Sequence, residues 1–168
     1  MRLLFGFDAE KCTACGACAI ACMDQNDIDV EAGQRPYRRV LIRETQAGRR
    51  YLSLACLHCA DAPCIPACPV NCLYRDDKTE LVRYDNTACV GCRACQRACP
   101  HDALSFRPTG AQRPREKMEK CHGCLERVEA GLSPACVRAC PTGALTWRWA
   151  EDSETPAAFA HQGADCHT

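Results

Sequence analysis

The apolar positions of this 168-residue chain fall in short stretches of β type. Three of these stretches, residues 73–75, 104–106 and 145–147, each begin at the leucine that closes a Cys-Pro-x-x-Cys/Ala-Leu sequence. No apolar run approaches the ~20 residues that a membrane-spanning helix needs. The pattern predicts short strands that are joined by turns, without a direct membrane span.

The segments before these turns repeat as well. A Phe-Asp pair at residues 7–8 and a Tyr-Asp pair at residues 84–85 stand at the same distance before a group of cysteines. Short helices are expected at residues 15–24 and 92–99, and the proline that follows the second one ends it. The repeating unit is therefore a short strand, a cysteine loop, a short helix, a Cys-Pro turn and another strand.

The intervening segments are polar. Residues 24–53 contain β-branched positions that favour a hairpin through residues 37–42 and 51–52. Residues 107–120 hold proline, glycine and charge, which predicts a loop. Residues 151–168 are polar and are expected to form a loose tail.

Composition narrows the class of protein. Cysteine supplies 18 of the 168 residues, about eleven per cent, and it is counted in the hydrophobic share of 47%. Large apolar side chains are correspondingly few, so burial alone gives a weak core and the cysteines must contribute to it. The net charge is zero, which leaves no basic field for nucleic acid. No secretory signal precedes Cys12 and the Arg49-Arg50 pair is internal, so we expect a cytoplasmic protein, with export beside a signal-bearing partner left open.

Sixteen of the cysteines form four groups of four, here called motifs 1 to 4. The motifs are Cys12, Cys15, Cys18, Cys22; Cys56, Cys59, Cys64, Cys68; Cys89, Cys92, Cys95, Cys99; and Cys121, Cys124, Cys136, Cys140.

Disulfides, zinc and iron–sulfur clusters compete as explanations. A disulfide scaffold needs an oxidising compartment, for which the sequence carries no signal. Zinc prefers two CxxC-type pairs with a longer spacer, which only motif 4 resembles. Motifs 1 and 3 read C-x2-C-x2-C-x3-C, the run typical of bacterial ferredoxins, in which the fourth cysteine ligates the other cluster of a pair. The pattern predicts sixteen ligands for four [4Fe–4S] clusters.

The crossing of the fourth cysteine predicts which motifs work together. Motifs 2 and 3 are separated by the length of half a ferredoxin, so they are expected to form one two-cluster module, and motifs 1 and 4 the other. We number each ligand set by the motif that supplies three of its thiolates. Set 1 is Cys12, Cys15, Cys18, Cys140; set 2 is Cys56, Cys59, Cys64, Cys99; set 3 is Cys89, Cys92, Cys95, Cys68; and set 4 is Cys121, Cys124, Cys136, Cys22.

The expected fold is α+β, with one ferredoxin-like module inserted into another. Residues 1–52 and 116–150 make the outer module, residues 53–115 the inner one and residues 151–168 the tail.

At this point the chain resembles the four-cluster electron-transfer subunits of molybdenum- and tungsten-pterin oxidoreductases, such as the iron–sulfur subunit of dimethyl sulfoxide reductase. The resemblance covers residues 3–149 and is carried by Cys12-x2-Cys15-x2-Cys18, Cys56-x2-Cys59-x4-Cys64, Cys89-x2-Cys92 and Cys121-x2-Cys124-x11-Cys136. It also extends to the small polyferredoxin subunits of tungsten aldehyde oxidoreductases. The chain departs from the family in its short linker between motifs 3 and 4 and in Met23, which replaces the proline after Cys22.

The resemblance implies a non-catalytic subunit that relays electrons. Its partners would be a molybdenum- or tungsten-pterin catalytic subunit at the set 1 end and a second redox partner at the set 3 end. That second partner would be a flavin subunit, a further copy of this chain or a membrane anchor. The sequence contains no nucleotide-binding or hydrolase motif, and it therefore offers no candidate catalytic residue. The alternative is a free polyferredoxin, or an electron-transfer partner of a hydrogenase or carbon monoxide dehydrogenase.

Four further cysteine and histidine residues lie outside the predicted ligand pattern, and each has an expected role or environment. Cys72 aligns with alanine in the other repeats, so we expect a small buried residue beside a cluster. Cys166 lies in the tail and is expected to have no ligand role. His58 and His122 sit inside CxxC sequences, either as hydrogen-bond partners of cluster sulfur or as surface loop residues.

Basic residues lie in or beside the motifs and are expected to offset part of the clusters' negative charge, although some will be ordinary surface residues. They are Lys11, Arg93, Arg97, Lys120, Arg127 and Arg138.

Overall fold

The computed structural model describes residues 2–46, 48–108 and 116–151, which form eight short strands and four short helices. The expected α+β class is confirmed. In chain order the elements are β1 (Arg2–Phe7), α1 (Ala17–Gln25), β2 (Arg39–Thr45), β3 (Gly48–Leu54), β4 (Leu73–Arg75), β5 (Val82–Tyr84), α2 (Ala94–Ala98), β6 (Leu104–Pro108), β7 (Glu116–Lys120), α3 (Leu125–Glu129), α4 (Ala135–Arg138) and β8 (Leu145–Ala150). The tail from residue 152 on, with Cys166, lies outside the described residues.

The described strands pair into four antiparallel two-stranded sheets, β1–β8, β2–β3, β4–β5 and β6–β7. The β1–β8 sheet joins the two ends of the described chain and aligns Phe5 with Trp147. The β2–β3 hairpin confirms the pairing expected in residues 24–53. All three strands expected after the Cys-Pro turns are present as β4, β6 and β8.

The segment between β6 and α3 differs from the sequence prediction. Residues 107–120 were expected to be a loop, but β6 extends to Pro108 and Glu116–Lys120 forms β7. The alternation of β7 is concealed because one of its two inward side chains is a lysine: Met118 and Lys120 are both buried. A charged residue at a core position hides the period of two on which strand prediction depends.

The helices follow the cysteine loops directly. The residues before α1, α2 and α3 are Gly16, Arg93 and Cys124, and all three have left-handed backbone conformations. Helix α2 ends at Ala98, and Cys99, the extended residue that follows it, precedes a proline, as expected. Helix α1 runs past Cys22 to Gln25, because Met23 permits the helix to continue where proline would stop it.

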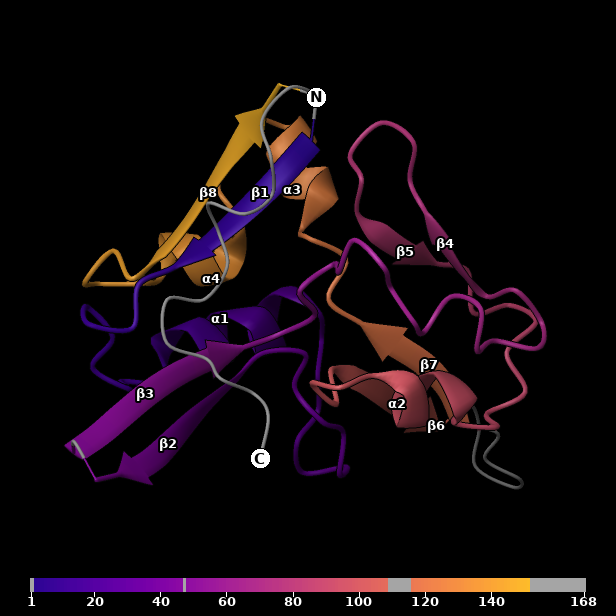
Figure 1. The fold of residues 1–168 in the computed structure, drawn as a ribbon, viewed down its shortest axis with the longest axis horizontal. Helices are drawn as coiled ribbons and strands as arrows, with labels where there is room; N and C mark the ends of the chain where they lie inside the picture. Colours follow the sequence, from indigo (N-terminus) through magenta and orange to yellow (C-terminus); the bar gives the residue numbers. More distant parts are fainter. Residues whose placement is uncertain (1, 47, 109–115, 152–168) are drawn as a thin grey trace.

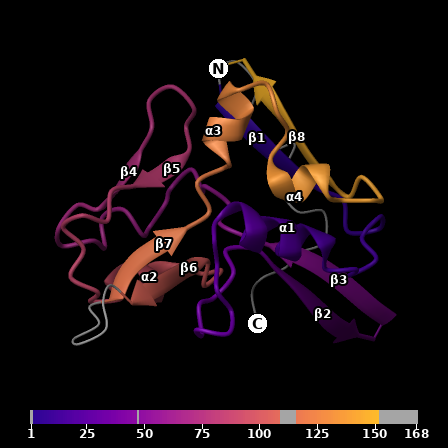
Figure 2. The ribbon, with the colours of Figure 1, turned by 180° about the vertical axis from the view of Figure 1, so that it is seen from behind.

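The elements gather in two groups, visible from both sides in Figures 1 and 2. One group contains β1, β8, α1, α4 and the β2–β3 hairpin, and the other contains β4–β7 and α2. Helix α1 packs on α4 within the first group. The β4–β5 loop connects the groups: the Leu3 N–H donates to the Thr79 carbonyl at 3.1 Å, and the buried Leu81 packs on Leu3, Leu125 and Val128.

The core consists of several small apolar clusters, and cysteines belong to three of the four. The largest surrounds Leu104 and Met118 and includes Cys64, Cys72 and Cys95. This distribution agrees with the low content of large apolar residues and places the thiols inside the fold.

Candidate iron–sulfur cluster sites

The loops that carry the CxxC sequences share an unusual backbone. Each contains residues with positive φ, among them Ala14 in motif 1, His58 in motif 2, Gly91 in motif 3 and Gly123 in motif 4. A left-handed residue reverses the chain within one step, so successive cysteines can face a common centre.

The Cys-Pro turns share a second local device. The third residue after each of these cysteines has positive φ, and the three residues are Asn71, Asp102 and Gly143, types that tolerate that conformation. The next N–H then points back at the sulfur: Cys72 N–H donates to Cys68 Sγ at 3.2 Å, and Ala103 N–H donates to Cys99 Sγ at 3.4 Å. Such donors stabilise a thiolate.

Set 1 comes together between the motif 1 loop and the end of α4. Cys12, Cys15, Cys18 and Cys140 line one small cavity. The pKa of Cys140 is lowered: burial raises it, but hydrogen bonds from the Leu145 N–H, the Thr142 hydroxyl and further backbone N–H groups of the Cys-Pro turn outweigh burial.

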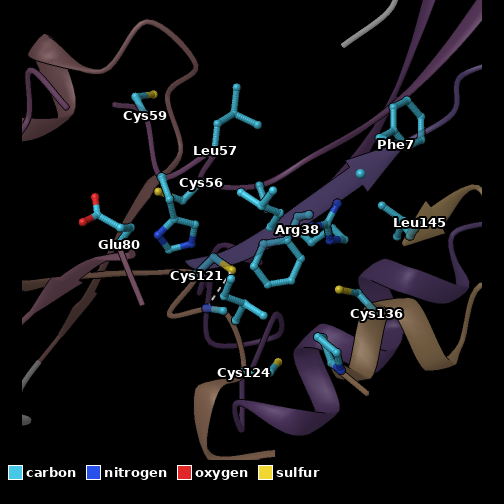
Figure 3. A pocket seen from close by; sticks show the side chains of 18 of the residues that line it. Phe7, Arg38, Cys56, Leu57, Cys59, Glu80, Cys121, Cys124, Cys136 and Leu145 are labelled. Atoms are coloured by element: carbon cyan, nitrogen blue, oxygen red, sulfur yellow. Dashed lines mark hydrogen bonds between the residues drawn. The ribbon is translucent and has the colours of Figure 1, made fainter. Parts of the chain in front are cut away.

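Set 4 joins α1 to the motif 4 loop. Burial raises the pKa of the Cys22 thiol, and neighbouring thiolates raise it further, namely Cys121, Cys136 and Cys124. Burial also raises the pKa of Cys124 to about 11. The Gly123 N–H donates to Cys121 Sγ at 3.4 Å. Figure 3 shows the Cys121, Cys124 and Cys136 side chains bordering the same cavity, whose volume is about 380 Å³.

Set 2 lies beside the same cavity. Burial raises the pKa of Cys56 to about 11, opposed by the charge of Lys120 and reinforced by Cys64. Burial raises the pKa of Cys59 and of Cys64, and the negative charge of Cys99 raises both further.

Set 3 lies in the largest apolar cluster. Burial raises the pKa of Cys95 to about 11, and the charges of Cys68, Cys89 and Cys92 add to the effect. The Met118 N–H of β7 donates to Cys89 Sγ at 3.4 Å. Members of each predicted set therefore lie near one another, and the division into sets stays a prediction.

The donor set fits [4Fe–4S] clusters. All cysteines among the described residues are free thiols, and five of the sulfurs named above accept a backbone N–H or lie at a Cys-Pro turn that supplies one. Within the described part of the chain, no group of three His, Cys, Asp or Glu side chains is arranged to hold a single metal ion. Cluster binding must displace the thiol protons, which burial holds in place in the absence of iron.

Neighbouring sets also lie near one another. Cys18 of set 1 acts on Cys136 of set 4, and Cys121 of set 4 acts on Cys56 of set 2. Cys64 of set 2 and Cys95 of set 3 share one apolar cluster. These proximities favour the order set 1, set 4, set 2, set 3 along the molecule.

Cys72 is buried with 2% of its surface exposed, as expected for a small core residue. Burial raises its pKa to about 12, with further contributions from the charges of Cys68 and Cys89. It thus lies beside set 3.

Both histidines are half-buried, so neither is a fully exposed loop residue. The His58 Nδ1 atom accepts the Val82 N–H at 3.1 Å, and burial lowers the pKa of its ring. His122 is hydrogen-bonded through Nε2 to the Asn26 side chain at 2.9 Å, and burial lowers its pKa as well. Both rings are therefore neutral at pH 7.

Two buried cations stand among the thiols. Lys120 is fully buried and donates to the carbonyls of Val82 and Cys121. The second, Arg38, was not singled out in the sequence. Burial lowers its pKa, but the thiolate charges of sets 4 and 1 outweigh burial and raise it. Arg38 lies in an arginine-rich segment whose charges suggest surface, and only its tertiary contacts reveal its position.

Comparison with known proteins agrees with the donor set. Residues 47–148 match the family described as "4Fe-4S dicluster domain", and residues 9–23 match "4Fe-4S binding domain". A putative iron-sulfur subunit of dimethyl sulfoxide reductase from Halobacterium salinarum is 37% identical over 88% of this chain and 66% of its own length.

Two further relatives are similar. One chain of the anaerobic dimethyl sulfoxide reductase of Haemophilus influenzae is 36% identical over 84% of this chain and 71% of its own length. The thiosulfate reductase electron transfer subunit PhsB of Salmonella typhi is 35% identical over 88% of this chain and 76% of its own length. This chain thus spans about two thirds to three quarters of the length of these relatives.

Fold, donor set and comparisons define an iron–sulfur protein that holds [4Fe–4S] clusters. The chain belongs to the family of iron–sulfur electron-transfer subunits of molybdenum-enzyme oxidoreductases. None of the helices in the described residues has the length and apolar character needed to cross a bilayer.

Proposed function

We propose that this chain carries electrons through four [4Fe–4S] clusters, held by sets 1, 4, 2 and 3 in that order, between a catalytic subunit and a second redox partner. The observation that carries the proposal is the exposure of the ligands. Of the sixteen cysteines, all within the described residues, Cys15 of set 1 and Cys92 of set 3 are exposed, whereas the ligands of sets 4 and 2 are buried or half-buried. Electrons can therefore enter and leave at the two ends of the line, while the middle is shielded.

The nested arrangement of modules is part of the proposal. Residues 1–52 and 116–150 form the outer module, supported by the β1–β8 sheet and the packing of α1 on α4. Residues 53–115 form the inner module. The boundary at residue 115 falls between β6 and β7, so this hairpin joins the two modules.

We assign a molybdenum- or tungsten-pterin catalytic subunit to the set 1 end. The names of the relatives support a partner of this kind, since they are subunits of dimethyl sulfoxide reductase, thiosulfate reductase, arsenate respiratory reductase and formate dehydrogenase. The set 3 end would contact the second redox partner, which is a flavin subunit, another copy of this chain or a membrane anchor. We place the complex in the cytoplasm, where thiols remain reduced until clusters are inserted.

Cross-linking of the complex from its native source tests the layout. Lys11 is exposed and adjacent to Cys12 of set 1, and Lys117 lies against the loop before Cys89 of set 3 through its bond to the Thr87 carbonyl at 2.7 Å. We expect cross-links from Lys11 to the pterin-containing subunit and from Lys117 to the second partner. The reverse pattern would overturn the assigned direction, and cross-links of both lysines to one subunit would overturn the two-ended line.

A second candidate function is electron transfer for a hydrogenase. The hydrogenase-2 operon protein HybA of Escherichia coli O157:H7 is 31% identical over 87% of this chain, and the chain covers 51% of its length. Metal analysis of the co-purified large subunit separates the two functions. Molybdenum or tungsten supports the first, and hydrogenase activity without either metal supports the second.

A further inference from the structure

Arg38 is a buried guanidinium without a carboxylate partner among the described residues. It is 7% exposed, and the hydrogen bonds of its Nη1 atom go to the Ser53 carbonyl and the Ser53 hydroxyl, both at 3.0 Å. A buried charge is costly unless an opposite charge or several hydrogen bonds compensate it. Neutral partners on a single serine leave the positive charge itself uncompensated, so negative charge must come from another source.

Several predicted cluster ligands line the same cavity as this guanidinium. Its charge acts on Cys136, Cys121 and Cys22 of set 4 and on Cys18 of set 1. Figure 3 shows the Arg38 side chain beside Cys136 within the cavity. The Ser53 Oγ atom extends the contact to the other set, because it lies 3.3 Å from Cys18 Sγ. When Cys18 is a thiolate, the serine hydroxyl must donate this bond, and its lone pairs accept the arginine N–H.

We propose that Arg38 and Ser53 form an electrostatic bridge between the clusters of set 1 and set 4 and raise the reduction potentials of both. Arg38 stabilises the additional negative charge that either cluster carries after it has received one electron. A single electron passes between the two clusters. The positive charge lies near both of them, so it stabilises whichever cluster holds that electron. Arg38 is thus a positioning residue for electron transfer, and the inference rests on the ligand sets proposed above.

The choice of residues fits this role. A guanidinium stays protonated when buried, whereas a buried ammonium can lose its proton. Arg38 lies directly before β2, and Ser53 lies on β3, where it pairs with Val40. The hairpin extends away from this junction and its outer positions are exposed, so its base is the part that contacts the thiols.

Redox titration of the isolated holoprotein, followed by electron paramagnetic resonance, tests the bridge without a partner protein. In Arg38→Met, we expect the reduced-to-oxidised ratio at a fixed potential to fall about tenfold for two clusters, which is 59 mV for a one-electron couple. The other two clusters should be unchanged. Arg38→Lys should recover more than half of the shift. Ser53→Ala should lower the reduction potential of the set 1 cluster more than that of the set 4 cluster. Cys15→Ser and Cys124→Ser assign the two signals.

Arg43→Met is the matched control, because it removes one positive charge from an exposed position of β2, the strand that follows Arg38 directly. It should leave all four potentials unchanged. The proposal is overturned if Arg38→Met retains its iron but shifts no potential, or shifts all four equally. If Arg38→Met fails to hold its clusters, Ser53→Ala decides: unchanged potentials in that variant would also overturn the bridge. Iron and sulfide analysis tests the ligand sets separately, so failure of the two ideas can be told apart.

Discussion

At the scale of the residue, two cysteines four positions apart have different environments. Cys68 Sγ accepts the Cys72 N–H and neighbours Cys95, as expected of a ligand at a Cys-Pro turn. Cys72 occupies the position at which the other two repeats have Ala103 and Ala144, and all three side chains are buried. Sequence type alone therefore does not identify a ligand, because position within the repeated turn decides it.

We predict that Cys72→Ala retains all four clusters and loses about 1 kcal/mol of stability, the effect of removing one buried atom where alanine already fits elsewhere. Cys68→Ala should instead damage the set 3 cluster, although it belongs to motif 2. Iron content and electron paramagnetic resonance of both variants check the prediction. Loss of a cluster in Cys72→Ala would show that the ligand sets are misassigned.

The cysteine loops of the candidate site could be predicted from the sequence. Of its two buried cations, only one could. Ligand spacing is a local property of a loop and is therefore written into consecutive residues. Lys120 was noted because it adjoins Cys121, but Arg38 and Ser53 reach the thiols through the packing of a distant hairpin. The local sequence carries no record of such a contact.

At the scale of the element, each cysteine loop depends on what packs against it. Gly16 and Gly91 occupy related loops and have φ values of +80° and +72°. A Cβ at Gly16 would meet no atom within 4 Å, whereas a Cβ at Gly91 would lie 2.5 Å from the Glu116 carbonyl oxygen of β7. The motif 3 loop thus packs against β7 at Gly91, whereas the motif 1 loop has open space at Gly16.

Gly16→Ala should cost about 1 kcal/mol, the strain of a left-handed alanine, and should retain its clusters. Gly91→Ala adds a collision with backbone, so we expect a loss of more than roughly 2 kcal/mol and depletion of the set 3 cluster. Thermal loss of the cluster absorbance compares the two variants. Equal stabilities would mean that β7 does not constrain the motif 3 loop.

The strands after the Cys-Pro turns and the β2–β3 hairpin were predictable because turn chemistry and β-branched residues mark them. Strand β7 was missed because its pairing with β6 is stabilised by a buried Met118 beside a buried Lys120, and a lysine normally signals surface. Helix α3 was missed because it is five residues long and too short for a helical period to show.

At the scale of the whole molecule, the number of clusters follows from the ligand sets. Four [4Fe–4S] clusters require about sixteen iron and about sixteen acid-labile sulfide per chain after anaerobic isolation. Colorimetric analysis measures both directly. Half of these amounts, or zinc in stoichiometric quantity, would contradict four cubane clusters.

The last prediction concerns what holds the molecule together. Three of its four apolar clusters contain cysteines, so each of these three depends on thiols that ligation would draw together. Metal binding free energy acts as folding free energy where ligands come from distant segments, as Cys22 and Cys121 do in set 4. The cluster-free chain, kept reduced, should therefore lose its tertiary structure.

Circular dichroism after chelation under reductant should show no cooperative thermal transition, and reconstitution with iron and sulfide should restore one. Cys72→Ala is the control, since its folding should depend on the clusters in the same way as that of the unmodified chain. A cooperative transition in the cluster-free protein would mean that the sheets and the buried Leu81, Leu104 and Met118 suffice for folding. The clusters would then bind to a fold that is stable without them, and the low content of large apolar residues would need another explanation.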